Sequence, residues 1–373
     1  MTEAAPARLR LVLIFTEGHG DYARAFAAVA APRADVLLIG PDAYDGPEIA
    51  ELGLADAWLP PWPRHRRPLA NLRLLLALGR RTRRFRADVV HVLSEGQVWL
   101  NLLPALVRPT PVVVTLHDVT PHPGDGDTAR VPRGLVDRFV RRADAVLVHG
   151  EGLKRDAVAH LGLDPARVAV GVHPPNLRYR RIAQARGFRK PDDGRFRLLF
   201  FGRIFPYKGL QHLIAAEPAI AAAVPGLLTT IAGRGEDLAG YRAAMVEPAR
   251  FDVRDRRIPD EEVAQLFAEA DLLMLPYVEA SQSGVLAVAA AFGLPVVASD
   301  VGEMGEVVRR TGMGALVPPA DPDALAQATI ALAADPGAYA RASAASEAAA
   351  SGALGDDSVW SGASAAYAVA RQR

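Results

Sequence analysis

The stretch LLFFGRIFPYKG, residues 198–209, is the most informative part of this sequence. Its leading apolar residues predict a buried strand, which Gly202 and Arg203 end. After a turn, Lys208 and Gly209 open a helix that reads GLQHLIAA. A helix entered from a glycine-broken strand presents free backbone N–H groups to anions, and Arg203 and Lys208 flank the gap. The junction therefore predicts a diphosphate cradle, and the alternative is an ordinary strand–turn–helix junction with surface cations.

Length and composition set outer limits on the class of protein. The 373 residues are enough for two domains, and the net charge of +1 gives no overall attraction to polyanions. The absence of cysteine excludes disulfides, thiolate metal sites and a cysteine nucleophile. The polar start MTEAAPARLR does not resemble a signal peptide, and no apolar stretch has the length of a membrane span. We therefore expect a cytoplasmic protein.

Apolar strand segments alternate with helical segments along both halves of the chain, which is the pattern of parallel α/β sheets. The polar, proline-containing residues 173–195 are typical of a linker, and the alternation restarts with FRLLFF at residue 196. The sequence therefore predicts an α/β protein with two doubly wound domains, residues 1–180 and 181–345, facing across a cleft. A C-terminal helical segment over residues 346–373 is expected to pack back on the first domain.

Polar residues follow two expected strands of the first half, at the edge where open α/β sheets bind ligands. His91, Ser94 and Glu95 lie at or after the end of one strand, and His117 and Asp118 directly follow another. A histidine in this position is either a buried structural residue or part of a ligand site, and the sequence leaves both open for His117.

Arginines crowd residues 64–86, which contain no acidic residue and enclose the apolar block at 72–78. A basic amphipathic helix of this kind can lie on an anionic membrane surface. The alternative is a solvated helix whose arginine stems pack on the domain. Nucleic-acid binding is not expected, because no aromatic stacking platform accompanies the arginines.

The second half contains a further pair of loops suited to a nucleotide. Glycines 233 and 235 follow an expected strand in IAGRGED, and Ser281 to Gly284 precede a helix of small residues. The backbone N–H groups at the entrance to that helix predict a second anion cradle.

In order and spacing, these segments resemble the retaining GT-B glycosyltransferases of the large family four. The resemblance is strongest over residues 196–320, in FFGRIFPYKG, IAGRGED, IPDEEVAQLFAEADLLMLP and SQSGVLAVAAAFGLPVVASDVGEMGEVV. The first half adds VVHV, VVVTLHDVTPHPG and VGVHPPN, which are similar to the family's strand-end motifs.

The resemblance implies a sugar-nucleotide donor held mainly by the C-terminal Rossmann-like domain and an acceptor bound by the N-terminal one. It implies roles for the following residues by position: Arg203, Lys208, Ser283 and Gly284 at the diphosphate, Gly233 and Gly235 beside the nucleotide, Arg257 and Ile258 near the base, and Glu279, His117 and Asp118 at the donor sugar. It also implies that no metal and no cofactor beyond the nucleotide sugar is needed.

The sequence departs from the family at one expected glutamate. The family usually carries two glutamates eight positions apart, of which Glu279 matches the first. Ala287 stands at the second position, and the neighbouring Val288 cannot replace a carboxylate that normally grips the ribose.

The expected function is transfer of a sugar, with retention, in the synthesis of cell-surface polysaccharide or glycoconjugate at the inner face of the membrane. Two alternatives remain open. The missing glutamate would fit a catalytically silent GT-B protein that acts as a binding or regulatory partner. An epimerase or phosphorylase of the same fold is also compatible with the pattern, because fold does not determine function.

Overall fold

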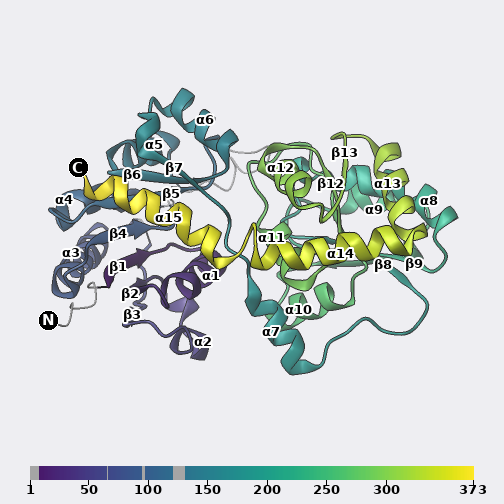
Figure 1. The fold of residues 1–373 in the computed structure, drawn as a ribbon, viewed down its shortest axis with the longest axis horizontal. Helices are drawn as coiled ribbons and strands as arrows, with labels where there is room; N and C mark the ends of the chain where they lie inside the picture. The colour runs from purple at the N-terminus through teal and green to yellow at the C-terminus, as the bar shows by residue number, and fades with distance from the viewer. Residues whose placement is uncertain (1–7, 65, 95–96, 121–130) are drawn as a thin grey trace, which may run out of the picture. The chain divides into compact units, whose positions relative to one another are not determined.

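The computed structural model describes residues 8–64, 66–94, 97–120 and 131–373, which fall into two compact units (Figure 1). Among the described residues, the first unit contains 8–119, 131–174 and 356–373, and the second contains 120 and 175–355. The expected boundary at residue 180 falls inside a helix of the second unit, α7 (Leu177–Arg186). That unit also contains α14 (Pro336–Ser351), so the chain re-enters the first unit only at residue 356.

The first unit is built on a parallel sheet of seven strands in the order β3-β2-β1-β4-β5-β6-β7. Its strands are β1 (Leu9–Ile14), β2 (Ala34–Ile39), β3 (Asp56–Trp58), β4 (Val89–Val92), β5 (Val112–Leu116), β6 (Ala145–His149) and β7 (Val168–Gly171). Its helices are α1 (Gly20–Ala30), α2 (Pro47–Ala50), α3 (Pro68–Phe85), α4 (Leu103–Val107), α5 (Arg133–Arg142), α6 (Glu151–Leu161) and α15 (Asp356–Arg371), with short 3₁₀ turns at Asp42–Tyr44, Val98–Leu102 and Pro165–Arg167.

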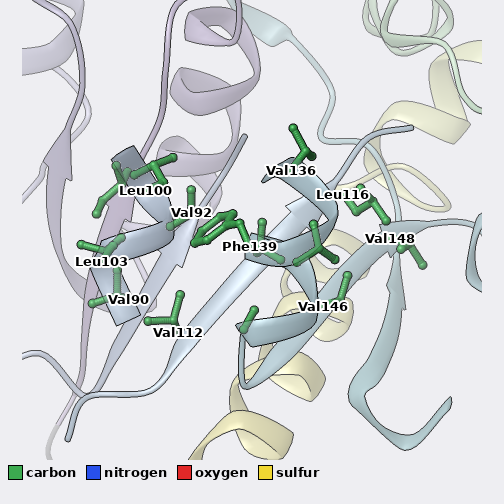
Figure 2. Packing of buried hydrophobic residues seen from close by; sticks show 14 of the residues in the cluster. Val90, Val92, Leu100, Leu103, Val112, Leu116, Val136, Phe139, Val146 and Val148 are labelled. Atoms are coloured by element: carbon green, nitrogen blue, oxygen red, sulfur yellow. The ribbon is translucent and has the colours of Figure 1, made fainter. Parts of the chain in front are cut away.

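Both faces of this sheet are buried, which is why its strands are apolar at nearly every position. On β5, Val112 and Val114 join a core with Phe139 of α5, while Val113 faces the opposite core with Tyr367 of α15. Figure 2 shows the first of these cores, where valines of β4, β5 and β6 meet side chains of α4 and α5. The helix α15 packs along β6 and β7, so the end of the chain completes the first unit.

The second unit repeats the plan with a six-stranded parallel sheet in the order β10-β9-β8-β11-β12-β13. Its strands are β8 (Phe196–Phe201), β9 (Leu227–Gly233), β10 (Phe251–Asp255), β11 (Leu272–Leu275), β12 (Val296–Ser299) and β13 (Gly314–Val317). Besides α7 and α14, its helices are α8 (Leu210–Ala223), α9 (Ala239–Ala243), α10 (Asp260–Glu269), α11 (Gly284–Phe292), α12 (Gly302–Thr311) and α13 (Pro322–Ala334), with 3₁₀ turns at Pro206–Lys208 and Pro248–Arg250.

The segment interpreted as a linker contains the helix α7, which packs against α10 and α11. Its arginine-rich sequence hides the helix, but Tyr179 and Ala183, spaced i and i+4, are buried on one face. Gly187 then ends the helix in a left-handed conformation with φ of 69°. Only residues 173–176 and the stretch after α7 remain without helix or strand.

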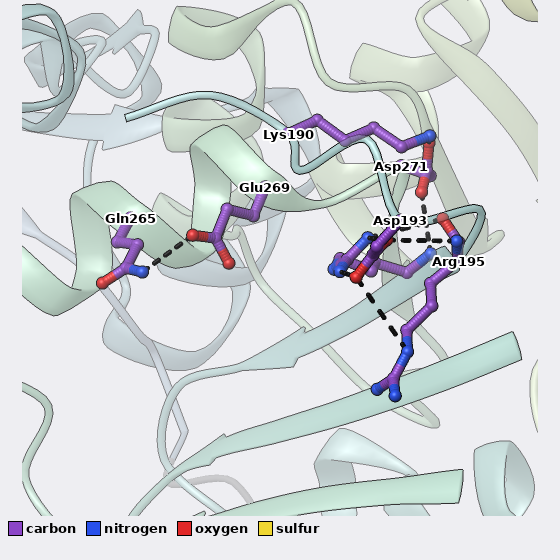
Figure 3. A network of polar contacts seen from close by, with 7 residues as sticks. Lys190, Asp193, Arg195, Gln265, Glu269 and Asp271 are labelled. Atoms are coloured by element: carbon purple, nitrogen blue, oxygen red, sulfur yellow. Dashed lines mark hydrogen bonds and ion pairs between the residues drawn. The ribbon is translucent and has the colours of Figure 1, made fainter. Parts of the chain in front are cut away.

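Polar contacts fasten the chain to the amino-terminal edge of the second sheet (Figure 3). The buried carboxylate of Asp271, which precedes β11, accepts hydrogen bonds from the backbone N–H of Arg197, at 2.7 Å, and from the Lys190 ammonium. The Arg197 guanidinium in turn pairs with Asp193. These ion pairs lie at the start of β8 and β11, which leaves the carboxyl ends of both strands for a ligand site.

Candidate active site

The loop between β8 and α8 has the predicted strand–turn–helix geometry. Gly202 ends the strand with φ of 121°, and the 3₁₀ turn Pro206–Lys208 leads to Gly209, which has φ of 69°. A Cβ on Gly209 would lie 1.8 Å from the carbonyl oxygen of Pro276, which follows β11. Only glycine fits there, so the loop is held directly against the carboxyl end of the neighbouring strand.

Lys208 is buried at this place and its side chain lies on an aromatic ring. The Lys208 Nζ donates a hydrogen bond to the hydroxyl of Tyr277 and lies 4.1 Å from the centre of the Tyr277 ring. It also lies 5.5 Å from the Tyr207 ring. Burying an ammonium group costs several kcal/mol unless the charge is compensated, so a buried lysine at the end of a strand is a candidate for holding an anion.

Tyr277 connects this loop to the second predicted cradle. Burial raises the pKa of Tyr277 to about 12, against the opposing effects of a hydrogen bond with the Ser283 side chain and of the nearby Arg203 charge. The phenol is therefore neutral at physiological pH. Tyr277 was not among the residues predicted from the sequence, although its place directly after the strand DLLMLP indicates a strand-end position.

The second cradle is the N-terminus of α11. Ser283 is the N-cap residue, and its side chain accepts from the backbone N–H of Leu286 at 3.4 Å. Gly284 is the first residue of the helix. The backbone N–H of Val278 donates to the carbonyl of Tyr207 at 2.8 Å, which ties the loop before α11 to the turn that carries Lys208. The two cradles predicted separately are therefore one cluster.

Arg203 lies at the exposed edge of this cluster. Its guanidinium donates to the Tyr207 hydroxyl at 3.3 Å and lies 5.3 Å from the centre of the Phe205 ring. The structure thus brings together Arg203, Lys208 and Ser283, with backbone N–H groups beside them. This combination of a planar fork, a point charge and a helix N-terminus suits a diphosphate.

The two glycines expected near the nucleotide have a structural reason of their own. A Cβ on Gly233, where φ is 155°, would lie 1.7 Å from the carbonyl oxygen of Gly202. A Cβ on Gly235 would lie 1.7 Å from the carbonyl oxygen of Ile204. Both are needed for the loop after β9 to pack on the loop after β8, and their contact with a nucleotide remains a prediction.

The remaining predicted residues of the second unit lie on loops at the same edge of the sheet. Arg257 is exposed and Ile258 is half-buried between β10 and α10, and Glu279 is exposed between β11 and α11. Ala287, at the position of the expected second glutamate, is only 2% exposed, and Val288 is also buried. A carboxylate at either position would lose its hydration, and the helix has buried apolar side chains there instead.

In the first unit, His117 follows β5 and is buried. Its Nε2–H donates to the carbonyl of Leu93 at 2.9 Å, which leaves Nδ1 as an acceptor. Burial lowers the pKa of His117, although this hydrogen bond and the adjacent Asp118 oppose the effect. Ser94, the residue after Leu93, forms a hydrogen bond between its hydroxyl and that of Thr16 at 2.8 Å. Glu95 lies outside the described residues.

Two further histidines continue the cluster from His117: His149, which was not predicted, and His173, which belongs to the motif VGVHPPN. The rings of His117 and His149 are 5.7 Å apart, and those of His149 and His173 are 5.6 Å apart. Tyr22 of α1 packs against all three, with its ring 4.8 Å from that of His117. Their place in the sequence could have indicated both histidines, because each stands at or just after the end of a strand. Among the described residues, no group of three or more potential metal ligands is placed to hold an ion.

These buried imidazoles predict that the protein is destabilised by mild acid. Burial, with the neighbouring His117, lowers the pKa of His91 to about 3 and that of His173 to about 4, and burial places the pKa of His149 well below its usual range. The unfolded chain takes up these protons below pH ~6.5, whereas the folded chain does not. The free energy of unfolding therefore has its full contribution from the neutral imidazoles above that pH and loses it as the pH falls toward 4. In this range each histidine lowers the free energy of unfolding by on the order of 1 kcal/mol for every pH unit of acidification.

Calorimetric unfolding between pH 7.5 and 5.5 measures this effect. We expect a falling midpoint for the natural protein and a shallower fall for His149→Phe, which keeps a ring in the cluster but removes one titrating group. A pH dependence that is the same in the two proteins would contradict the assignment.

Comparison with known proteins supports one family for both halves. A family profile described as "Glycosyltransferase Family 4" matches residues 17–171, and one described as "Glycosyl transferases group 1" matches residues 195–335. Together they cover most of both units. The chain belongs to the GT-B glycosyltransferases of family four.

This family-four glycosyltransferase is 29% identical over 272 residues to the phosphatidyl-myo-inositol mannosyltransferase of Mycobacterium leprae, in a match that covers 71% of this chain and 70% of the relative. It is 31% identical over 234 residues to the D-inositol 3-phosphate glycosyltransferase of Streptomyces bingchenggensis, covering 57% of this chain and 50% of the relative. Anabaena Alr3699/HepE, solved in complex with UDP-glucose, superposes with a TM-score of 0.69 at 16% identity, over 97% of this chain and 98% of that one. That likeness confirms the predicted two-domain GT-B fold.

Proposed function

We propose that this glycosyltransferase moves a sugar from a nucleotide-diphosphate donor to a hydroxyl of a glycan or lipid-linked acceptor, with retention of the anomeric configuration. The observation that carries the proposal is the cluster of Arg203, Lys208 and the α11 N-terminus around Tyr277. The Anabaena relative of the same fold was solved with UDP-glucose, which supports a nucleotide sugar as donor.

In the proposed reaction the bond between the sugar C1 and the diphosphate oxygen breaks, and negative charge grows on the leaving diphosphate. Lys208 and Arg203 stabilise that charge together with the N–H groups at the start of α11. These groups supply the positive charge themselves, so we expect turnover to survive a chelator.

Retention follows if the acceptor oxygen bonds to C1 on the face that the diphosphate leaves. The proton of the acceptor hydroxyl then passes to a diphosphate oxygen, and no side chain has to act as a nucleophile. We infer that His117 and Asp118 of the first unit, and Glu279 of the second, act at the donor sugar, with Arg257 and Ile258 near the base. We place the reaction in polysaccharide or glycoconjugate synthesis because one relative is a mannosyltransferase of a phosphatidyl-myo-inositol lipid.

The stereochemistry is tested by transfer from an α-linked nucleotide sugar, with the anomeric proton of the product followed by NMR. An α-linked product is expected, and chelator should not change the rate. A β-linked product would contradict retention while leaving glycosyl transfer intact. Donor binding without transfer to any glycan or lipid acceptor would contradict the proposed activity itself.

We also propose that the first unit contacts an anionic membrane surface through residues 64–86. Among the described residues, no helix is long and apolar enough to cross a bilayer. Some arginines of the segment have structural contacts: Arg81 lies 3.5 Å from Asp56 and 4.7 Å from the centre of the Trp58 ring, and Arg83 donates to the carbonyl of Leu106. The arginines left to face a surface are the other exposed ones of the segment, at both ends of α3: Arg64, Arg66, Arg67, Arg73, Arg80, Arg84 and Arg86.

A further inference from the structure

Two adjacent arginines follow β10, and their surroundings differ. The Arg256 guanidinium donates two hydrogen bonds of 2.7 Å to the two carboxylate oxygens of Glu262, which lies in the first turn of α10. Arg257, which is expected near the base, is exposed and forms no ion pair with a carboxylate among the described residues. One guanidinium is therefore fixed to the protein, and the next one along the chain is left for a ligand.

Glu262 also holds a second arginine. Its Oε1 accepts a hydrogen bond from Arg254 Nη1 at 2.7 Å, and Arg254 donates two more, of 2.9 and 2.7 Å, to Asp252. The Glu262 side chain is only 17% exposed, and its hydrogen bonds with Arg256 and Arg254 lower its pKa. A largely buried carboxylate that accepts from two guanidinium groups, one of them bidentate, is held more firmly than an ordinary surface ion pair.

The loop between β10 and α10 has backbone hydrogen bonds at its ends. At the start, the N–H of Arg256 donates to the carbonyl of Gly233 at 2.9 Å, and at the end the carbonyl of Pro259 accepts from Val263 at 2.9 Å. Residues 257 and 258 form no backbone–backbone hydrogen bond with other described residues. The pairing of Arg256 with Glu262 therefore closes the loop from its first residue to the helix that follows it.

A loop that is already ordered before a ligand arrives loses less conformational entropy when the ligand binds. Without the Glu262 carboxylate, Arg256 would be released and residues 257 and 258 would be less restricted. The groups assigned to the diphosphate lie on other loops, at the end of β8 and the start of α11. Loss of the pairing should therefore weaken recognition of the base and leave the hold on the diphosphate intact.

We propose that Glu262 is a positioning residue for the base of the donor nucleotide. It holds Arg256 so that Arg257 and Ile258 meet the base, and it acts through the loop without touching the nucleotide. This role rests on the proposed function, because it requires a nucleotide at this edge of the second sheet. It adds a residue that determines how strongly the site distinguishes one base from another.

The test compares Glu262→Gln with Glu261→Gln by calorimetric titration with UDP, GDP and ADP. Both changes remove one carboxylate from the first turn of α10, so they alter the net charge and the interaction with the helix dipole alike. Glu261 pairs instead with Arg186 of α7, at 3.1 Å. In Glu262→Gln we expect the affinity of the tightest-binding nucleotide to fall by roughly fivefold or more, with less than about a twofold change for the other two. Glu261→Gln should bind all three like the natural protein.

Arg256→Lys provides a second variant, which keeps the charge at an exposed side chain. A single ammonium group cannot form the two parallel hydrogen bonds of the guanidinium. We therefore expect the same selective loss, of roughly threefold or more, for the tightest-binding nucleotide. Combining this change with Glu262→Gln should cost no more than Glu262→Gln alone, because both remove the same contact.

The possible outcomes separate this role from the proposed function. An equal loss for all three nucleotides in Glu262→Gln, the same loss in Glu261→Gln, or unchanged affinities in both Glu262→Gln and Arg256→Lys would overturn the positioning role and leave nucleotide binding intact. Equal affinities of the natural protein for UDP, GDP and ADP would also overturn it, because the loop would then not distinguish the base. If the natural protein bound none of the three, the proposed function would fail and the positioning role with it.

Discussion

Replacing Lys208 by methionine should lower kcat/KM for the donor by about 10²- to 10³-fold, the usual loss when one preorganised charge-stabilising group is removed. Methionine keeps the length and apolar stem of the side chain, so it can remain under the Tyr277 ring, where Lys208 lies 4.1 Å from the ring centre. What it removes is the positive charge opposite the leaving diphosphate. Steady-state kinetics with the preferred donor measure the loss.

The stability of the variant separates a chemical role from a structural one. Because the lysine charge is buried, its removal should leave the unfolding midpoint unchanged or raise it. Tyr277→Phe is the matched control: it keeps the ring but removes the hydroxyl that accepts from Lys208. We expect a smaller kinetic loss for it, since the charge remains but is less well held. If Lys208→Met binds and turns over the donor normally, the cradle is wrongly assigned.

Replacing His117 by alanine should reduce kcat by about 10²-fold and change donor affinity little, as expected for a residue that acts on the sugar rather than on the nucleotide. The donor groups lie in the second unit, whereas His117 follows β5 in the first. Nucleotide binding by calorimetry and turnover by product formation measure the two effects separately.

His117→Gln distinguishes chemistry from packing. The glutamine amide can replace the hydrogen bond that Nε2–H donates to Leu93, but it does not provide the Nδ1 acceptor in the same place. The unfolding midpoint of His117→Gln should therefore lie above that of His117→Ala and close to that of the natural protein, while its turnover stays low. Turnover restored by glutamine would make His117 a residue that only positions the strand-end loop. Equal losses of affinity and turnover in His117→Ala would contradict a role at the sugar.

Local patterns in the sequence were sufficient to predict the parallel sheets and the backbone geometry of the two loops interpreted as anion cradles. Residues 198–209 predict a strand, a glycine turn and a helix because each is determined by neighbours in the chain, and the structure has β8, the 3₁₀ turn and α8 there. The same holds for the start of α11, where Ser283 is a favoured N-cap residue.

Contacts between distant parts of the chain were not predictable in this way. Tyr277 joins the two cradles only because β8 and β11 are adjacent in the sheet. The strand β3, of three residues, is too short to show a pattern. The helix α7 was not predicted because its many arginines obscure the apolar pattern, and only the folded structure shows which of its residues are buried.

The most direct test of the account is calorimetric titration with UDP, GDP and ADP of the natural protein, of Arg203→Ala and of Arg242→Ala. Arg242 is an exposed arginine of α9 in the same unit, to which no role is assigned, and serves as the control. We expect at least one nucleoside diphosphate to bind the natural protein and Arg242→Ala alike, with an affinity that falls at least tenfold in Arg203→Ala. Binding that is unaffected by Arg203→Ala, or no binding of any nucleotide, would contradict a diphosphate site at the end of β8.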